Sequence, residues 1–112
     1  MTRAILIDPK ERSFTEVEYN GDYKTIYPLL ECETFDIAYT DVGDIFVDDE
    51  GLINGKDYFF QIKGCPQPLA GRGLLFGPVD DDGESTPATI KIEDLEKIVG
   101  FTTRQKLIEE LG

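Results

Sequence analysis

Apolar residues in this chain occur in short runs, and turn-forming residues bound each run. Residues 4–7 end at Asp8-Pro9, residues 45–47 lie between acidic turns, and residues 74–76 end at Gly77. Apolar runs of this length predict buried strands. Helical patterns do not alternate regularly with these runs, so parallel βαβ units are not expected. The pattern therefore predicts a mostly antiparallel sheet.

The remaining elements follow from periodicity and capping residues. Alternating or β-prone residues predict strands over 14–19, 34–40 and 58–62, the first of which forms a hairpin with 4–7. Asp22 is a suitable cap for a short early helix over 23–30, although Pro28 weakens its interior.

Helical spacing returns near the end of the chain. It predicts a helix over 93–99 that stops at Gly100, and a final helix to Leu111 that begins at Thr102 or Thr103. Residues 88–90 are either a last short strand or the lead into a helix. The expected fold is one α+β domain over 1–112, with a mostly antiparallel sheet, a short early helix and one or two C-terminal helices.

The charge and the residue types present exclude several kinds of function. The chain has 23 acidic and 11 basic residues, a net charge of −12, and no histidine. Such a surface repels nucleic acid and anionic membranes. Without histidine, zinc hydrolases and Ser-His or Cys-His nucleophiles are not expected. We therefore predict a protein that is not an enzyme and that uses no cofactor, no metal, no nucleic acid and no membrane.

The cysteines and the N-terminus indicate where the chain works. Cys32 and Cys65 form no CxxC motif, which favours two reduced, partly buried thiols and leaves open whether they meet. The apolar run at 4–7 is too short for a signal peptide or a membrane span. We therefore expect a cytoplasmic protein.

The most distinctive feature is an acidic tract. Residues 31–50 contain eight acidic residues and neither lysine nor arginine. Carboxylates on a rigid sheet can imitate the phosphates of a nucleic acid or steer a basic partner, whereas the alternative is a solvated acidic face. The loop at 80–84 starts like a calcium loop, but its twelfth position is Lys91, so a solvated loop is expected. The candidate partner-binding residues are the acids of both segments: Asp41, Asp44, Asp48, Asp49, Glu50, Asp80, Asp81, Asp82 and Glu84.

A second candidate site surrounds the arginine at position 72. Gly71 and Gly73 flank Arg72, so backbone N–H groups and a guanidinium could approach a phosphate together. The segment matches neither a P-loop nor GxGxxG. The alternative is a turn residue that pairs with a nearby carboxylate.

The order of motifs resembles that of a known family. It runs through Asp-Asp-Glu-Gly-Leu-Ile-Asn-Gly (48–55), Ala-Gly-Arg-Gly-Leu-Leu-Phe-Gly (70–77), Asp-Asp-Asp-Gly-Glu (80–84) and Glu-Asp-Leu-Glu-Lys-Ile (93–98). This order resembles a small domain of unknown function, number 3846, carried mainly by bacteriophages and mobile elements. The resemblance transfers no catalytic or ligand residue. It implies a phage or mobile-element origin, in which small acidic proteins bind and inhibit host machinery.

Three functions follow as hypotheses. The first is a small acidic binding protein that acts like a DNA mimic in the bacterial cytoplasm and inhibits a host protein by masking its basic surface. The second is a sponge that sequesters a nucleotide signal of anti-phage defence at Gly71, Arg72 and Gly73. The third is a structural or assembly accessory protein. The sequence also leaves open a homo-oligomer.

Overall fold

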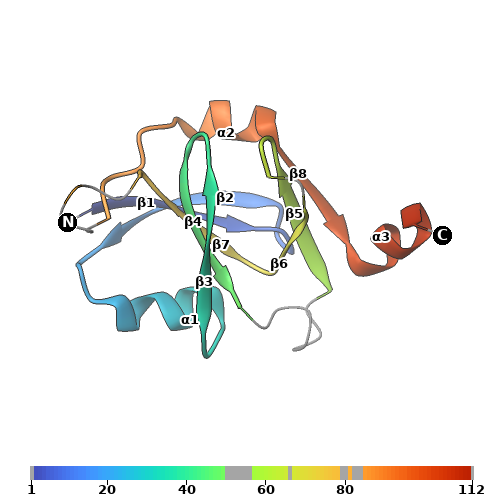
Figure 1. The fold of residues 1–112 in the computed structure, drawn as a ribbon, viewed down its shortest axis with the longest axis horizontal. Coiled ribbons are helices and arrows are strands. Elements are labelled where there is room, and N and C mark those ends of the chain that lie inside the picture. The colour runs from blue at the N-terminus through green and yellow to red at the C-terminus, as the bar shows by residue number, and fades with distance from the viewer. Residues whose placement is uncertain (1, 50–56, 66, 79–80, 82–84, 112) are drawn as a thin grey trace.

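Two antiparallel sheets form the body of the molecule (Figure 1). The computed structural model describes residues 2–49, 57–65, 67–78, 81 and 85–111. The larger sheet has the strand order β2-β1-β7-β4-β3, with β1 at Thr2–Asp8, β2 at Ser13–Tyr19, β3 at Phe35–Thr40, β4 at Gly43–Asp48 and β7 at Gly73–Phe76. The smaller has the order β6-β5-β8, with β5 at Tyr58–Ile62, β6 at Leu69–Ala70 and β8 at Val99–Thr103. The predicted α+β class is confirmed.

Short helices complete the fold. A 3₁₀ turn, η1 (Tyr23–Thr25), leads into α1 (Ile26–Leu30), and α2 (Ile92–Ile98) and α3 (Arg104–Leu111) follow late in the chain. The Asp22 carboxylate accepts the Lys24 N–H at 3.0 Å, as its predicted capping role requires. Pro28 is tolerated because it lies in the first turn of α1, where a backbone N–H has no partner within the helix. The early helix and both late helices were predicted correctly.

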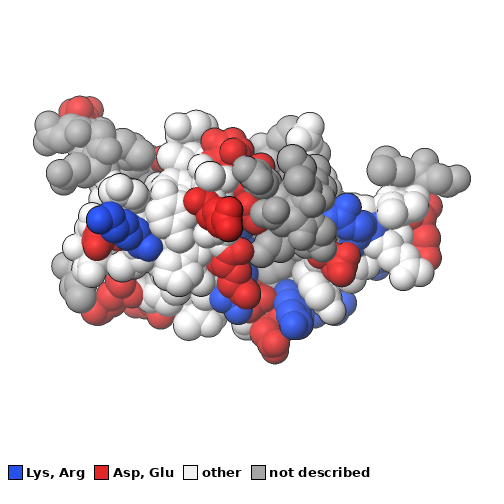
Figure 2. All heavy atoms as spheres, turned by 90° about the horizontal axis from the view of Figure 1, so that it is seen from below, with Lys and Arg blue, Asp and Glu red and all other residues white. Residues whose placement is uncertain are grey.

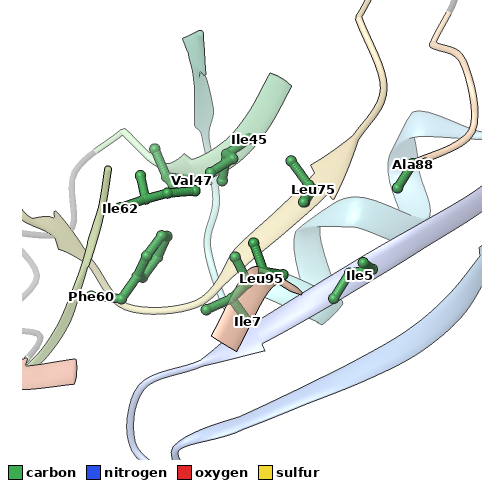
Figure 3. Close-up of a cluster of buried hydrophobic side chains, with 9 residues drawn as sticks. All are labelled: Ile5, Ile7, Ile45, Val47, Phe60, Ile62, Leu75, Ala88 and Leu95. Atoms are coloured by element: carbon green, nitrogen blue, oxygen red, sulfur yellow. The ribbon is translucent and has the colours of Figure 1, made fainter. Parts of the chain in front are cut away.

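Apolar side chains bury both faces of the five-stranded sheet. One face packs against α1, through Ala4, Leu74, Phe76, Phe46, Ile26 and Leu30. The other packs against β5 and α2, and Figure 3 shows its buried cluster: Ile5, Ile7, Ile45, Val47, Phe60, Ile62, Leu75, Ala88 and Leu95. The continuous apolar runs read from the sequence are therefore the central strands, which are buried from two sides.

The turn between β1 and β2 holds a carboxylate in a fixed place. The Asp8 Oδ1 atom accepts the N–H groups of Lys10 at 3.0 Å and Glu11 at 3.2 Å. These two strands pair in register from Thr2–Tyr19 to Asp8–Ser13, which is the predicted hairpin. The turn thus places the side chain of Asp8 at the end of a buried strand, where it is only 8% exposed.

The three-stranded sheet corrects the sequence interpretation. Val99 and Gly100, which were read as the end of a helix and its stop signal, instead begin β8, and this strand pairs along the whole of β5. Thr103 still serves the last helix, because its Oγ1 accepts the Lys106 N–H at 3.2 Å. Residues 88–90 are not a strand but lead into α2, which is the second of the two alternatives. The sequence also predicts a turn at Asn54-Gly55 and extends the last apolar strand to Val79, and these residues lie outside the described part of the chain.

Candidate functional site

The structure separates the residues of the acidic tract. Asp44 and Asp48 flank the buried apolar run of residues 45–47 in β4, and each is only 6% exposed. Neighbouring groups engage both of them. A side chain so buried cannot present its carboxylate to a protein surface, so the expected array of exposed acids loses these two members.

The two candidate acids that flank β4 lie far apart. Asp41 precedes β4 and Asp49 follows it, and both are exposed. A strand of six residues spans roughly 20 Å, so the two carboxylates mark opposite ends of the sheet. Asp81 is exposed as well. The other candidates, Glu50, Asp80, Asp82 and Glu84, lie outside the described residues.

Arg72 is held by three groups from distant parts of the chain. Its Nε lies 3.3 Å from the Asp8 carboxylate and 3.2 Å from that of Glu31. One of its terminal nitrogens, Nη1, donates to the Leu29 carbonyl at 3.2 Å. The arginine thus connects the C-terminal end of α1 to the C-terminal end of β1. This is the alternative in which Arg72 pairs with nearby carboxylates, and here it has two of them.

The flanking glycines have packing and backbone roles in this structure. Gly71 has a φ of 75° and donates its N–H to the Tyr58 carbonyl at 2.9 Å. Gly73 lies in β7, where a Cβ would come within 2.6 Å of the Phe60 ring and 3.0 Å of Ile45. The glycines therefore serve a left-handed turn and a close approach of two core residues.

A hollow of about 220 Å³ surrounds Arg72 at the junction of the two sheets. We call it the Arg72 hollow; it is lined by Asp8, Pro9, Lys10, Glu11, Glu31, Asp57, Tyr58, Gly71 and Arg72. Four of these residues are acidic and two are basic. Since Arg72 already has two carboxylates beside it, the remaining charge of the hollow is negative. Its electrostatics favour a cation over an anion.

The surface around α1 and the lower ends of β3 and β4 is acidic without being uniform. Figure 2 views the molecule from this side and shows red acidic side chains in separate patches, among uncharged white and blue basic side chains. Such a mixed surface can steer a basic partner, but it does not have the unbroken negative charge of a nucleic acid backbone.

Neither Cys32 nor Cys65 forms a disulfide, and both are half-buried, as predicted. They pack on opposite faces of the five-stranded sheet, Cys32 with the α1 cluster and Cys65 with the other. The question left open by the sequence is therefore answered: the two thiols do not meet.

Metal and membrane features can be stated only for the described part of the chain. Within it, no group of three or more side chains is arranged to hold a metal ion. No helix among the same residues is both long and apolar enough to cross a bilayer.

Sequence reasoning found Arg72 but missed the residues that surround it. Asp8 was read as a turn residue and Glu31 as one acid of the tract. The Asp8-Pro9 turn was the available signal, because a carboxylate that closes a hairpin has a fixed position. Nothing in the spacing links it to positions 31, 57 and 72, which only the tertiary fold brings together.

Comparisons with known proteins place the chain in a family. Residues 1–101 match the model described as domain of unknown function DUF3846. The Sinorhizobium fredii protein described as uncharacterized protein y4iR is 35% identical over 94 residues, which cover 81% of this chain. The chain spans 58% of the length of that relative. No solved structure matches.

Proposed function

For this chain, which belongs to the DUF3846 family, we propose a non-enzymatic binding function. Its acidic surface binds a basic surface of a protein partner, and the Arg72 hollow receives a cationic side chain of that partner. The observation that carries the proposal is the lining of the hollow, with four carboxylates against two cations, one of which, Arg72, lies against two of those carboxylates.

The contacts of Arg72 support a cationic guest. An arginine that recognises phosphate must offer its guanidinium to the ligand in a bidentate contact. Here Nε already faces Asp8 and Glu31, and Nη1 donates to a backbone carbonyl. An arriving phosphate would compete with these groups and meet the repulsion of Glu11 and Asp57 on the rim. A lysine or arginine side chain would be attracted by Glu11, and by Asp57 in competition with Arg104, whose Nε lies 3.6 Å from that carboxylate.

The size of the hollow points the same way. Its volume of about 220 Å³ lies below the roughly 300–1,000 Å³ of sites that enclose whole small molecules. A single side chain suits this volume better than a nucleotide does. Tyr58 on the wall is 40% exposed, and its ring can contact the aliphatic stem of the guest or face its charge.

Proteins that bind nucleic acid are the partner class with the required basic surface. A phage or mobile-element origin, and inhibition of a host defence nuclease, restriction enzyme, polymerase or nucleoid protein, are the finer form of this proposal. They rest on the sequence resemblance and on the net charge of −12.

The test compares two variants that remove the same charge from different places. Glu11→Gln with Glu31→Gln neutralises two carboxylates of the hollow, whereas Glu93→Gln with Glu96→Gln neutralises two exposed carboxylates on α2. Tagged wild type and both variants are used to capture partners from a bacterial lysate, followed by mass spectrometry and a salt titration of each captured protein. We expect a partner with a basic surface that is lost from the hollow variant and retained by the α2 variant.

Other outcomes would count against the proposal. Equal loss from both variants would show that net charge alone is responsible, without the hollow. Capture that does not weaken with salt would contradict a charged contact. A nucleotide that raises the melting temperature of the wild type, but not that of Arg72→Ala, would establish the nucleotide sponge instead.

A further inference from the structure

Helix α3 lies at one end of the molecule, beyond the sheets (Figure 1). Its first residue anchors it: the Arg104 N–H donates to the Asp57 carbonyl at 2.7 Å, and the guanidinium lies 5.6 Å from the centroid of the Phe59 ring. Farther along the helix, Leu107 is half-buried and Ile108 is 62% exposed. The middle of the helix therefore leaves a large apolar side chain in water.

A second hollow, of about 480 Å³, lies beside this helix. We call it the α3 groove. Phe59 and Gln61 of β5 and Pro68 line one side of it, and Leu107 and Ile108 of α3 line the other. Apolar atoms form most of its wall. An apolar side chain beside an apolar groove forms a surface that can bind its own copy across a two-fold axis.

The charges of α3 run against its own dipole. Arg104 and Lys106 occupy its first half and Glu109 and Glu110 its second, so the first turn has no acid and the last turn has no base. A helix is stabilised by the opposite order, with acids at its N-terminus and bases at its C-terminus. A helix of eight residues is also too short to be stable by itself.

The same order is self-complementary for two antiparallel copies. Turning the helix about a point between Leu107 and Ile108 places Lys106 opposite Glu109, and it places Leu107 opposite Ile108. Each copy then brings acids to the N-terminus of the other and bases to its C-terminus, which corrects the dipole mismatch. In a chain of net charge −12, α3 has two basic and two acidic residues, so a second copy can approach it without repulsion there.

From this charge order and groove, we infer that α3 is the two-fold interface of a homodimer. The α3 helices of two copies pack antiparallel, with Lys106 of each chain against Glu109 of the other. Ile108 of each chain enters the α3 groove of its partner. Arg104 of α3 forms an ion pair with Asp57 of the Arg72 hollow at 3.6 Å, but the inference does not rest on the proposed function, because Lys106, Ile108 and Glu109 do not line that hollow.

Sedimentation equilibrium of the full chain over a wide range of protein concentration tests this inference. We expect the mass to rise from 12.6 kDa toward twice that value. Because a two-fold axis doubles each contact, Lys106→Glu should raise the dimer dissociation constant at least about tenfold. Lys106→Glu combined with Glu109→Lys restores opposite charges across the axis and should recover dimerisation. Lys24→Glu, at an exposed lysine on η1, changes the net charge equally and should leave the dimer intact.

Ile108→Ser tests the apolar part of the interface, and circular dichroism verifies that each variant is folded. We expect this variant to stay monomeric at concentrations where the wild type is a dimer. A wild type that is monomeric at every concentration would overturn the inference. So would a dimer that tolerates both Ile108→Ser and Lys106→Glu, or a charge swap that fails to recover what Lys106→Glu removes.

Discussion

The two sheets of this molecule differ in how much of each strand is buried. All described residues of β4 and β7 in the five-stranded sheet are buried, and clusters cover both of its faces. In the three-stranded sheet, β5 buries Phe60 and Ile62 in the shared core, whereas its other face lies against Pro68 and α3 and lines the α3 groove. The first sheet provides the stability of the fold, and the second leaves surfaces open for binding.

The Arg72 hollow lies where these two regions join. Asp8 comes from the end of β1 in the larger sheet, and Tyr58 from the start of β5 in the smaller. A site at such a junction has a rigid wall on one side and an open rim on the other. This position explains why residues of the buried core, such as Ile7, are direct neighbours in the sequence of residues that line the Arg72 hollow, such as Asp8.

The largest expected effect is a cavity in the five-stranded sheet. Leu75 is fully buried in β7, so Leu75→Ala should lower the free energy of unfolding by about 2–5 kcal/mol. Ile108→Ala, on α3, should change it by no more than about 0.5 kcal/mol. Urea unfolding of dilute protein measures both. Similar losses for the two variants would remove the distinction between the regions.

A pair of glycines sharpens the same comparison. Gly73→Ala places a Cβ against the buried Phe60 ring and Ile45, and such overpacking should cost about 1–3 kcal/mol. Gly100, in β8, has no atom within 4 Å of where its Cβ would be. Gly100→Ala should therefore stabilise the fold by about 0.4–1 kcal/mol, because it reduces the freedom of the unfolded chain. Thermal unfolding separates the two, and a loss at both glycines would contradict this account.

A smaller effect is expected at the ion pairs. Arg72→Met removes a partner of the poorly exposed Asp8 carboxylate and should cost about 1–2 kcal/mol in unfolding free energy. Lys97→Met breaks the exposed pair with Asp94 on α2, and pairs of this kind contribute about 0.5 kcal/mol or less. Equal effects in urea unfolding would show that Arg72 has no structural role.

The smallest effect concerns Tyr19 at the edge of the five-stranded sheet. Burial, followed by the nearby Asp22 carboxylate, raises the pKa of Tyr19 above 10.0. The folded state therefore prefers the protonated phenol, so this contribution to stability is complete below pH 10 and is lost as the pH rises through the raised pKa. Tyr19→Phe should lose less stability than the wild type over that alkaline range. If the unfolding free energies of the wild type and of Tyr19→Phe fell in parallel as the pH rises, the direction of the pKa shift would be contradicted.

The elements that could be predicted from the sequence are those with strong local patterns. Residues 4–7 and 74–76 form continuous apolar runs because their strands are buried on both faces. β8 was missed because Leu95, Ile98 and Val99 continue a helical spacing up to Gly100, and only pairing with β5 makes the last residues a strand. Tertiary contact decided that segment, as it often does for short elements.

The candidate site followed the same rule. The number of acids in the tract was visible, but Asp44 and Asp48 are buried because elements far away in the sequence cover both faces of β4. Arg72 was visible between its glycines, whereas its partners Asp8 and Glu31 lie far away in the sequence. Residue type and spacing identified the groups that could act, and only the fold showed which of them meet.

A titration of ¹⁵N-labelled chain, followed by NMR, tests the central claim that the Arg72 hollow binds cations. The probes are argininamide and inorganic phosphate at equal ionic strength. We predict that argininamide shifts the amide signals of Glu11, Glu31 and Gly71 saturably and less at high salt, while the core amides of Leu74 and Leu75 stay unchanged. Phosphate should leave the hollow signals in place. Saturable shifts of Gly71 and Arg72 with phosphate, and none with argininamide, would contradict the account.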